Sequence, residues 1–209
     1  LFRSPRVGQR AMSCTSCHSL HQPESDAREP ATWAKSQLKP GMDGNAACTQ
    51  CHPEFVDADA LTKHTRHAAN SSGSNCMECH MPHTSYGLLK AMRSHRVESP
   101  SVESELRTGR PNACNLCHLD KTLQWTQERL LEWHGAKPVE LDEDQRTVAA
   151  GPRWMLTGDA GIRALAAWNA GSEAARIASG SDWMLPYLAR LLDDPYYAVR
   201  IVAVRSLRS

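Results

Sequence analysis

Apolar and polar residues follow different patterns in the two parts of this 209-residue chain. From about residue 143, segments rich in Ala and Leu are interrupted by Gly, a pattern that predicts short helices packed against one another. Nearer the N-terminus, helical patterns stand out at residues 57–68, with Asp57 as N-cap, and at residues 121–134, ending at Gly135. We therefore predict a mainly α fold with much irregular loop, and C-terminal helices at 143–157, 159–170, 173–179, 182–193 and 196–208.

The composition provides few apolar side chains for a hydrophobic core in the first two thirds of the chain. There are two Phe and four Tyr, and the mean hydropathy is -0.51. Something other than side chains must therefore fill the interior there. A net charge of +1 and a pI near 7.8 give no electrostatic case for nucleic acid. No stretch approaches the roughly 18 apolar residues that indicate a membrane-spanning helix, so we expect a soluble protein.

All eight cysteines fall into four copies of one pattern, Cys-x-x-Cys-His, and none is left over. This is the attachment signature of c-type haem, in which two thiols add to the vinyl groups on one porphyrin edge and the His reaches the iron. We predict four c-type haems (haem c), attached through Cys14, Cys17, Cys48, Cys51, Cys76, Cys79, Cys114 and Cys117, with proximal iron ligands His18, His52, His80 and His118.

Structural zinc and disulfides are the alternatives for these cysteines. Cys-x-x-Cys pairs also build four-cysteine zinc sites, and eight cysteines can make four bridges. Neither alternative requires a His after each pair. With 10 His in 209 residues, a His after all four pairs has a chance probability of roughly 5 in a million. The histidines therefore favour haem.

Haem attachment also bears on location. It needs reduced thiols and, in bacteria and archaea, takes place after export, so we expect a periplasmic or extracellular protein. The sequence starts at Leu1 rather than Met, so any export signal has been removed or lies upstream.

Six further histidines are candidates for the second, distal ligand of each iron. His64 and His67 stand at i, i+3 in the predicted helix 57–68, where they would share a face one turn apart and serve two different irons. The alternative is that both are solvent-exposed helix residues. The seven Met residues are possible ligands too, and a Met ligand would raise the potential of its haem.

The remaining candidates differ in their position along the chain. His95 lies midway between the third and fourth motifs, where the chain must return across the haems. His21 is too close to His18 to reach over the same porphyrin, but it could ligate a neighbouring haem. We expect His83 and His134 to make hydrogen bonds or cap a helix C-terminus instead. The predicted distal ligands are His95, His64, His67 and His21.

Four attachment sites within residues 14–118 crowd the haems so closely that the macrocycles must touch. The haems would then be the core themselves, with gaps short enough for electron tunnelling. Arginines suit haem propionates because the guanidinium fork matches a carboxylate. The available ones are Arg66, Arg93, Arg96, Arg107 and Arg110, and for any single one of them a solvated surface charge is the simpler interpretation.

The chain has no Cys and no His from about residue 143 onward. We therefore divide it into a tetrahaem cytochrome c domain at 1–135, a linker at 136–142, and an α-helical repeat region at 143–209. Residues 185–207 resemble a HEAT repeat: an apolar first helix, an Asp-Asp-Pro turn, and a second helix with Val199-Arg200, Ala203 and Leu207. The alternative is an ordinary helical bundle.

Residues 61–133 resemble a family of bacterial multihaem cytochromes with C-terminal HEAT or TPR repeats. The shared motifs are His64-Thr-Arg-His67, Ser72-Gly-Ser-Asn-Cys76, Cys79-His80-Met-Pro with Tyr86 and His95, and Gly109-Arg-Pro-Asn-Ala-Cys114. The haem part also resembles the tetrahaem cytochromes that take electrons from hydroxylamine oxidation in nitrifiers. The resemblance implies stacked haems, ligation by His64, His67 and His95, and longer relatives with further haem motifs upstream.

Three functions are compatible with the sequence. The first is electron transfer between redox partner proteins through four mostly bis-His, low-potential haems. The second is an oxidoreductase in which one haem keeps an open site for a small nitrogen or sulfur compound. The third is a subunit of an extracellular cytochrome filament, in which one protomer supplies a His to a haem of the next.

Overall fold

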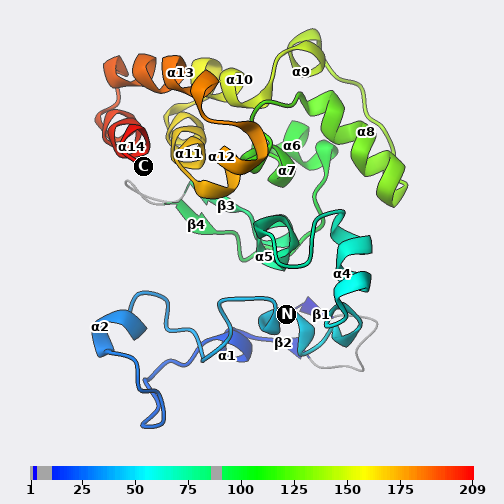
Figure 1. The fold of residues 1–209 in the computed structure, drawn as a ribbon, viewed down its shortest axis with the longest axis vertical. Helices are drawn as coiled ribbons and strands as arrows, with labels where there is room; N and C mark the ends of the chain where they lie inside the picture. The colour runs from blue at the N-terminus through cyan, green and yellow to red at the C-terminus, as the bar shows by residue number, and fades with distance from the viewer. Residues whose placement is uncertain (1, 4–10, 86–90) are drawn as a thin grey trace. The chain divides into compact units, whose positions relative to one another are not determined.

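The computed structural model describes residues 2–3, 11–85 and 91–209 and is mainly α-helical, with long irregular segments between short helices (Figure 1). This confirms the predicted fold class. Contacts between Cα atoms divide the chain into two compact units, Leu1–Met77 and Glu78–Ser209. Each unit has its own set of elements and its own pattern of burial.

The first unit is built from very short elements. Two strands form an antiparallel ribbon that pairs Phe2 with Met12 and Arg3 with Ala11. The longest helix among its described residues has eight residues. The elements are β1 (Phe2–Arg3), β2 (Ala11–Met12), α1 (Cys14–Cys17), α2 (Pro30–Trp33), α3 (Ala46–Thr49), α4 (Ala58–Thr65), and 3-10 helices at Pro53–Phe55 and Ser72–Ser74.

Very few side chains are buried in the first unit. Among its described residues, the buried ones are Ala47, Leu61 and Ser74. Ordering a chain costs about 1–2 kcal/mol per residue in backbone entropy, which buried apolar surface normally offsets. Two buried apolar side chains cannot offset it here, as the composition predicts. The first unit therefore needs a further apolar component to be stable.

Helix α4 begins where the sequence predicts and ends earlier. The Asp57 carboxylate accepts a hydrogen bond from the Ala60 amide at 2.8 Å, which confirms the predicted N-cap. The helix ends at Thr65 because Arg66 adopts a left-handed conformation with φ of 60°. The predicted continuation to residue 68 is therefore wrong.

The first half of the second unit combines a small hairpin with three helices. Helix α5 (Cys76–His80) runs across the division between the units. Strands β3 (His83–Ser85) and β4 (Ala91–Arg93) pair antiparallel, with Thr84 opposite Met92. Helix α8 ends at His134, as predicted, and its C-cap Gly135 is left-handed with φ of 66°. The helices after the hairpin are α6 (Val102–Thr108), α7 (Ala113–Cys117) and α8 (Leu123–His134).

Helices fill the C-terminal part of the chain, close to the predicted ranges. Two ranges are subdivided. Val148 is extended, which splits the predicted helix 143–157 in two. The range 182–193 contains an α-helix flanked by 3-10 turns at Asp182–Met184 and Leu191–Asp193. The helices are α9 (Glu143–Thr147), α10 (Ala150–Thr157), α11 (Ala160–Ala170), α12 (Glu173–Ser179), α13 (Leu185–Arg190) and α14 (Tyr197–Leu207).

These helices enclose the main hydrophobic core. Helix α11 packs against α10 and α14, and α14 packs against α13 (Figure 1). The core includes Leu116, Leu119, Trp154, Met155, Leu165, Met184, Leu188, Val199 and Val202. The pairs α10–α11 and α13–α14 are compatible with stacked helical repeats, although the HEAT-like character of the region stays a prediction.

The Asp-Asp-Pro turn is held by a buried ion pair. Arg163 of α11 donates two hydrogen bonds to the Asp194 carboxylate, at 2.6 and 3.0 Å, and the Asp194 side chain is 4% exposed. The same carboxylate accepts from the Tyr196 amide at 2.8 Å. The hydrogen bond from Arg163 lowers the pKa of Asp194 below its ordinary value. The turn before α14 is therefore tied to α11.

We expect Asp194→Asn to lower the free energy of unfolding of the second unit by about 2 kcal/mol at pH 7, because Arg163 loses its charged partner. Since the folded-state pKa of Asp194 is lowered, the stability that the pair contributes is present at neutral pH. It is lost as the pH falls through that lowered pKa, so the two proteins should converge in acid. Thermal unfolding followed by circular dichroism measures both effects. Asp193→Asn, at an exposed neighbouring position, is the control, and equal losses in both variants would contradict the assignment.

The fourth Cys-x-x-Cys-His segment is part of this helical unit. Helix α7 contacts α10, α11 and α12, and Ser179 of α12 donates a hydrogen bond to the Cys117 carbonyl at 2.8 Å. The contact division at residue 77 thus differs from the predicted limits at 135 and 143. Those limits rest on where Cys and His residues end along the chain, and they stay a prediction.

Candidate functional site

All four Cys-x-x-Cys-His segments fold into a short helical turn. In three of them the amide of the His donates to the carbonyl of the first Cys at the same distance, 2.9 Å, in the pairs His18–Cys14, His52–Cys48 and His118–Cys114. The remaining segment, the third along the chain, is α5 itself (Cys76–His80). One turn brings residues i and i+3 to the same side of the backbone. The two thiols and the His of each segment are therefore gathered at one place.

Asparagine side chains hold three of these turns. The Asn112 carbonyl oxygen accepts from the Cys114 amide at 3.0 Å, and Asn75 accepts from the Met77 amide at 3.0 Å. Asn45 is the N-cap residue of α3, which leads into the second segment. Its side chain donates to the Ser74 carbonyl at 3.0 Å and accepts from the Cys76 amide at 2.9 Å. One side chain therefore ties the second segment to the start of the third.

Buried polar groups support the fourth segment. The Glu105 carboxylate, 6% exposed, accepts from the Asn112 amide at 3.0 Å and from Arg153 at 2.8 Å. Burial raises the pKa of Glu105. Asn115, fully buried, donates to the carbonyls of His118 and Lys121 and accepts from Thr126 at 2.6 Å.

These supporting residues were missed by the sequence analysis. An Asn one to three positions before a Cys-x-x-Cys pair is the only local signal for the asparagines Asn45, Asn75 and Asn112. No local sequence pattern marks Glu105 or Asn115, because their hydrogen-bond partners are brought close only by the tertiary fold.

The eight cysteines are all free thiols, and Cys14 is the exposed one. The predicted zinc alternative gains no support: across residues 2–3, 11–85 and 91–209, no three His, Cys, Asp or Glu side chains are placed so that they could hold a metal ion. The thiols thus remain available for covalent attachment.

Cysteines of successive segments are neighbours. In the first unit Cys48 and Cys76 share a hydrogen bond, which raises the pKa of Cys48 and lowers the pKa of Cys76. Burial raises the pKa of Cys17, and the nearby Cys51 thiol raises it further.

In the second unit, a cysteine of the third segment likewise lies near a cysteine of the fourth segment. Burial, together with the charges of Glu78 and Cys79, raises the pKa of Cys117 to about 11. Burial also raises the pKa of Cys114 to about 11. The first segment is therefore next to the second, the second to the third, and the third to the fourth.

The imidazoles of two predicted proximal ligands are oriented by backbone carbonyls. His18 Nδ1 lies 2.9 Å from the Ser36 oxygen, and His80 Nδ1 lies 3.1 Å from the Glu98 oxygen. Since a carbonyl can only accept, Nδ1 carries the proton and Nε2 keeps a lone pair. Histidines that bind metals commonly donate their other ring N–H in this way.

The other two predicted proximal ligands have different neighbours. His52 Nδ1 lies 3.6 Å from a Glu54 carboxylate oxygen. The His118 ring packs against Trp125, with ring centres 5.1 Å apart.

Two predicted distal ligands show the same tautomer as His18 and His80. His95 is exposed, and its Nδ1 lies 3.1 Å from the Arg93 oxygen. His67 is half-buried, with Nδ1 2.6 Å from the Thr65 oxygen. His64 packs against Phe55 at 4.6 Å, and His21 is exposed.

The expected shared helical face of His64 and His67 is wrong. His64 lies in the last turn of α4, whereas His67 follows the left-handed Arg66 and lies outside the helix. Because the backbone changes direction between the two residues, their spacing of three positions does not place the two side chains on one helix face.

His83 and His134 lie outside the four Cys-x-x-Cys-His segments. The His83 ring meets the Trp168 ring edge-on, with centres 4.6 Å apart, and burial lowers the pKa of His83. His134 is the last residue of α8. Tyr86, which belongs to the family resemblance, falls outside the described residues.

The arginines expected to pair with propionates differ in their present contacts. Arg93 pairs with Glu78, while Arg96 and Arg110 pair with Glu98 at 3.0 and 2.7 Å. Arg66 and Arg107 are exposed. Three of the five arginines thus already contact carboxylates of the protein.

Comparison with known proteins gives one partial similarity. Over 80 residues, covering 38% of the chain, the sequence is 35% identical to the cytochrome c nitrite reductase subunit NrfA of Nitratidesulfovibrio vulgaris. The matched segment spans 13% of that protein's length. No protein-family model matches the chain, and no solved structure matches it. Within the described ranges, no helix has the length and apolar character needed to cross a membrane.

Proposed function

We propose that this chain is a tetrahaem c-type cytochrome that transfers electrons outside the cytoplasm. The observation that carries the proposal is that four Cys-x-x-Cys-His segments fold into the same turn with free thiols. When bound, each haem supplies an iron that changes reversibly between the ferric and ferrous states. The residues proposed to hold the haems are the eight cysteines and the proximal ligands His18, His52, His80 and His118.

The residues present fit this cofactor. Each turn gathers two thiols and an imidazole, which is what attachment through two vinyl groups and one iron bond requires. Nδ1 of His18 and of His80 donates to a carbonyl, so Nε2 is the unprotonated nitrogen, the form that binds iron.

The scarcity of buried side chains in the first unit also supports haem. Ala47 and Leu61 are the buried apolar residues among those described there. Porphyrin surface would supply the missing apolar contacts, which supports the proposal that haems replace a conventional core.

The neighbouring cysteines support an order of electron transfer. Cys17 is close to Cys51, Cys48 to Cys76, and Cys79 to Cys117. We infer that electrons pass along the segments in chain order, and that redox partner proteins exchange electrons with the first and fourth.

We propose His95, His64, His67 and His21 as distal ligands, giving mostly bis-His, low-potential haems. This is supported by the Nδ1 atoms of His67 and His95, each of which faces a backbone carbonyl, so that Nε2 is the unprotonated nitrogen, the form that binds iron. Attachment of haem also implies export, so we propose a periplasmic or extracellular location.

A second candidate function is favoured by the partial similarity to a nitrite reductase subunit. In that case one haem keeps an open site and the chain acts on a small nitrogen compound. It differs from the carrier in requiring a haem whose spectrum changes when nitrite or hydroxylamine is added.

The haem content tests the proposal directly. We expect four haems per chain by pyridine haemochrome assay and intact mass, and three in the variant Cys114→Ser/Cys117→Ser, because each segment attaches one haem independently. The variant Ser13→Ala/Thr15→Ala, which leaves every Cys and His in place, should keep four. Fewer than four haems in the unaltered protein would refute the assignment.

A further inference from the structure

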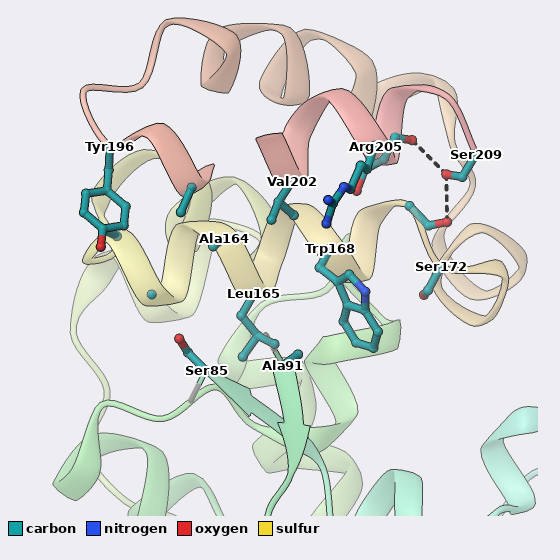
Figure 2. A pocket seen from close by; sticks show the side chains of 15 residues that line it. Ser85, Ala91, Ala164, Leu165, Trp168, Ser172, Tyr196, Val202, Arg205 and Ser209 are labelled. Carbon is teal, nitrogen blue, oxygen red and sulfur yellow. Dashed lines mark hydrogen bonds between the residues drawn. The ribbon is translucent and has the colours of Figure 1, made fainter. Parts of the chain in front are cut away.

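The second unit contains a pocket that the electron-transfer proposal does not use. It has a volume of about 610 Å³ and lies between α11, α14 and the strand residues Ser85 and Ala91 (Figure 2). This volume falls in the range of small-molecule sites, about 300–1,000 Å³. We refer to it as the α11–α14 pocket.

Small and aromatic side chains form most of its surface. Ala160 and Ala164 of α11 contribute small side chains to the lining, and Ser85 covers the helix at Gly161. Trp168 and Tyr196 stand toward opposite ends (Figure 2), and they are 40% and 47% exposed. An aromatic face that stays in contact with water in this way gains free energy when a flat apolar group covers it.

Arg205 is the one charged side chain among the described residues that line the pocket, and none of those residues is Asp or Glu. Figure 2 shows Arg205 reaching from α14 toward Trp168. Among the described residues Arg205 forms no ion pair, in contrast to Arg153 and Arg163 of the same unit.

We propose that the α11–α14 pocket binds an organic carboxylate with a flat apolar body. The carboxylate pairs with the Arg205 guanidinium, whose planar fork matches two carboxylate oxygens. The apolar body lies along Ala164 and covers the exposed face of Trp168. None of the described residues that line the pocket is a proposed haem-binding residue, so this inference does not rest on the haem content.

A carboxylate fits better than a phosphate or an uncharged ligand. One guanidinium neutralises a single negative charge, whereas a phosphate at neutral pH carries between one and two. An uncharged ligand would leave Arg205 partly desolvated without a partner.

Calorimetric titration of the haem-loaded chain with 2-naphthoate tests the proposal, with 2-naphthamide as the uncharged counterpart. We expect 2-naphthoate to bind with an affinity at least about tenfold higher than that of 2-naphthamide, the size of a charge-assisted hydrogen bond. Arg205→Gln should remove that preference and leave 2-naphthamide binding unchanged. Arg208→Gln, which changes an exposed arginine outside the pocket lining, is the matched control and should keep the preference.

A second variant tests the place of the apolar body. Ala164→Phe should abolish binding of both compounds, and its thermal unfolding curve shows whether the fold is kept. The proposal is overturned if 2-naphthoate does not bind the unaltered protein, or if Arg205→Gln and Arg208→Gln bind it equally. Since Arg205 is exposed, its replacement tests the proposal even if Ala164→Phe does not fold.

Discussion

Without attached haem, residues 1–77 are expected to be unfolded while the C-terminal helices stay folded. The first unit buries Ala47 and Leu61 as its apolar residues among those described, whereas the second has a continuous core around Leu165, Met184 and Val199. Burial of that core stabilises α10–α14 without any cofactor. A variant with all eight cysteines changed to Ser provides the haem-free chain.

Hydrogen exchange followed by mass spectrometry measures this difference segment by segment. In the haem-free variant we expect amides of α4 to exchange at the rate of an unstructured peptide, and amides of α11 and α14 to stay protected by several orders of magnitude. The haem-loaded chain, in which both regions should be protected, is the control. Equal protection of α4 in the two proteins would show that the first unit folds by itself.

Replacing His95 by Ala is expected to convert one of the four haems from low spin to high spin. The His95 ring donates through Nδ1 to the Arg93 carbonyl, so Nε2 is the atom lost from the iron. Electronic absorption and electron paramagnetic resonance measure the change. The opened site should then bind cyanide, to which the unaltered carrier is expected to be insensitive.

His134→Ala is the matched control for this substitution, because His134 ends α8 and is not expected to bind iron. Its spectrum should match that of the unaltered protein. An unchanged spectrum in His95→Ala would remove the ligand assignment. A cyanide or nitrite response in the unaltered protein would favour the oxidoreductase over the carrier.

Local sequence signals predict much of the fold. Asp57 before α4, Gly135 after α8 and the Ala-rich segments from residue 143 all act through contacts within a few residues, and the structure has these elements. The Cys-x-x-Cys-His turns are local in the same sense, since each His amide closes the turn on its own first Cys.

The rest depends on contacts that no local pattern contains. The left-handed Arg66 that ends α4 is not a Gly, so nothing in the composition marks it. Asn45 binds the amide of Cys76, 31 residues away, and Ser179 binds the Cys117 carbonyl from 62 residues away. The pairing of each distal His with an iron also depends on tertiary contacts, and it remains a prediction from the sequence.

The small number of buried side chains in the first unit has a consequence for its tolerance of substitutions. Packing constrains amino-acid identity mainly at buried positions, and within the described part of that unit these are Ala47, Leu61 and Ser74. A saturation-mutagenesis map of residues 11–77 should therefore be permissive at positions that contact no haem. Its intolerant positions should be the cysteines, the histidines, polar caps such as Asn45 and the apolar side chains that pack against a porphyrin, so that the map would outline the cofactor sites.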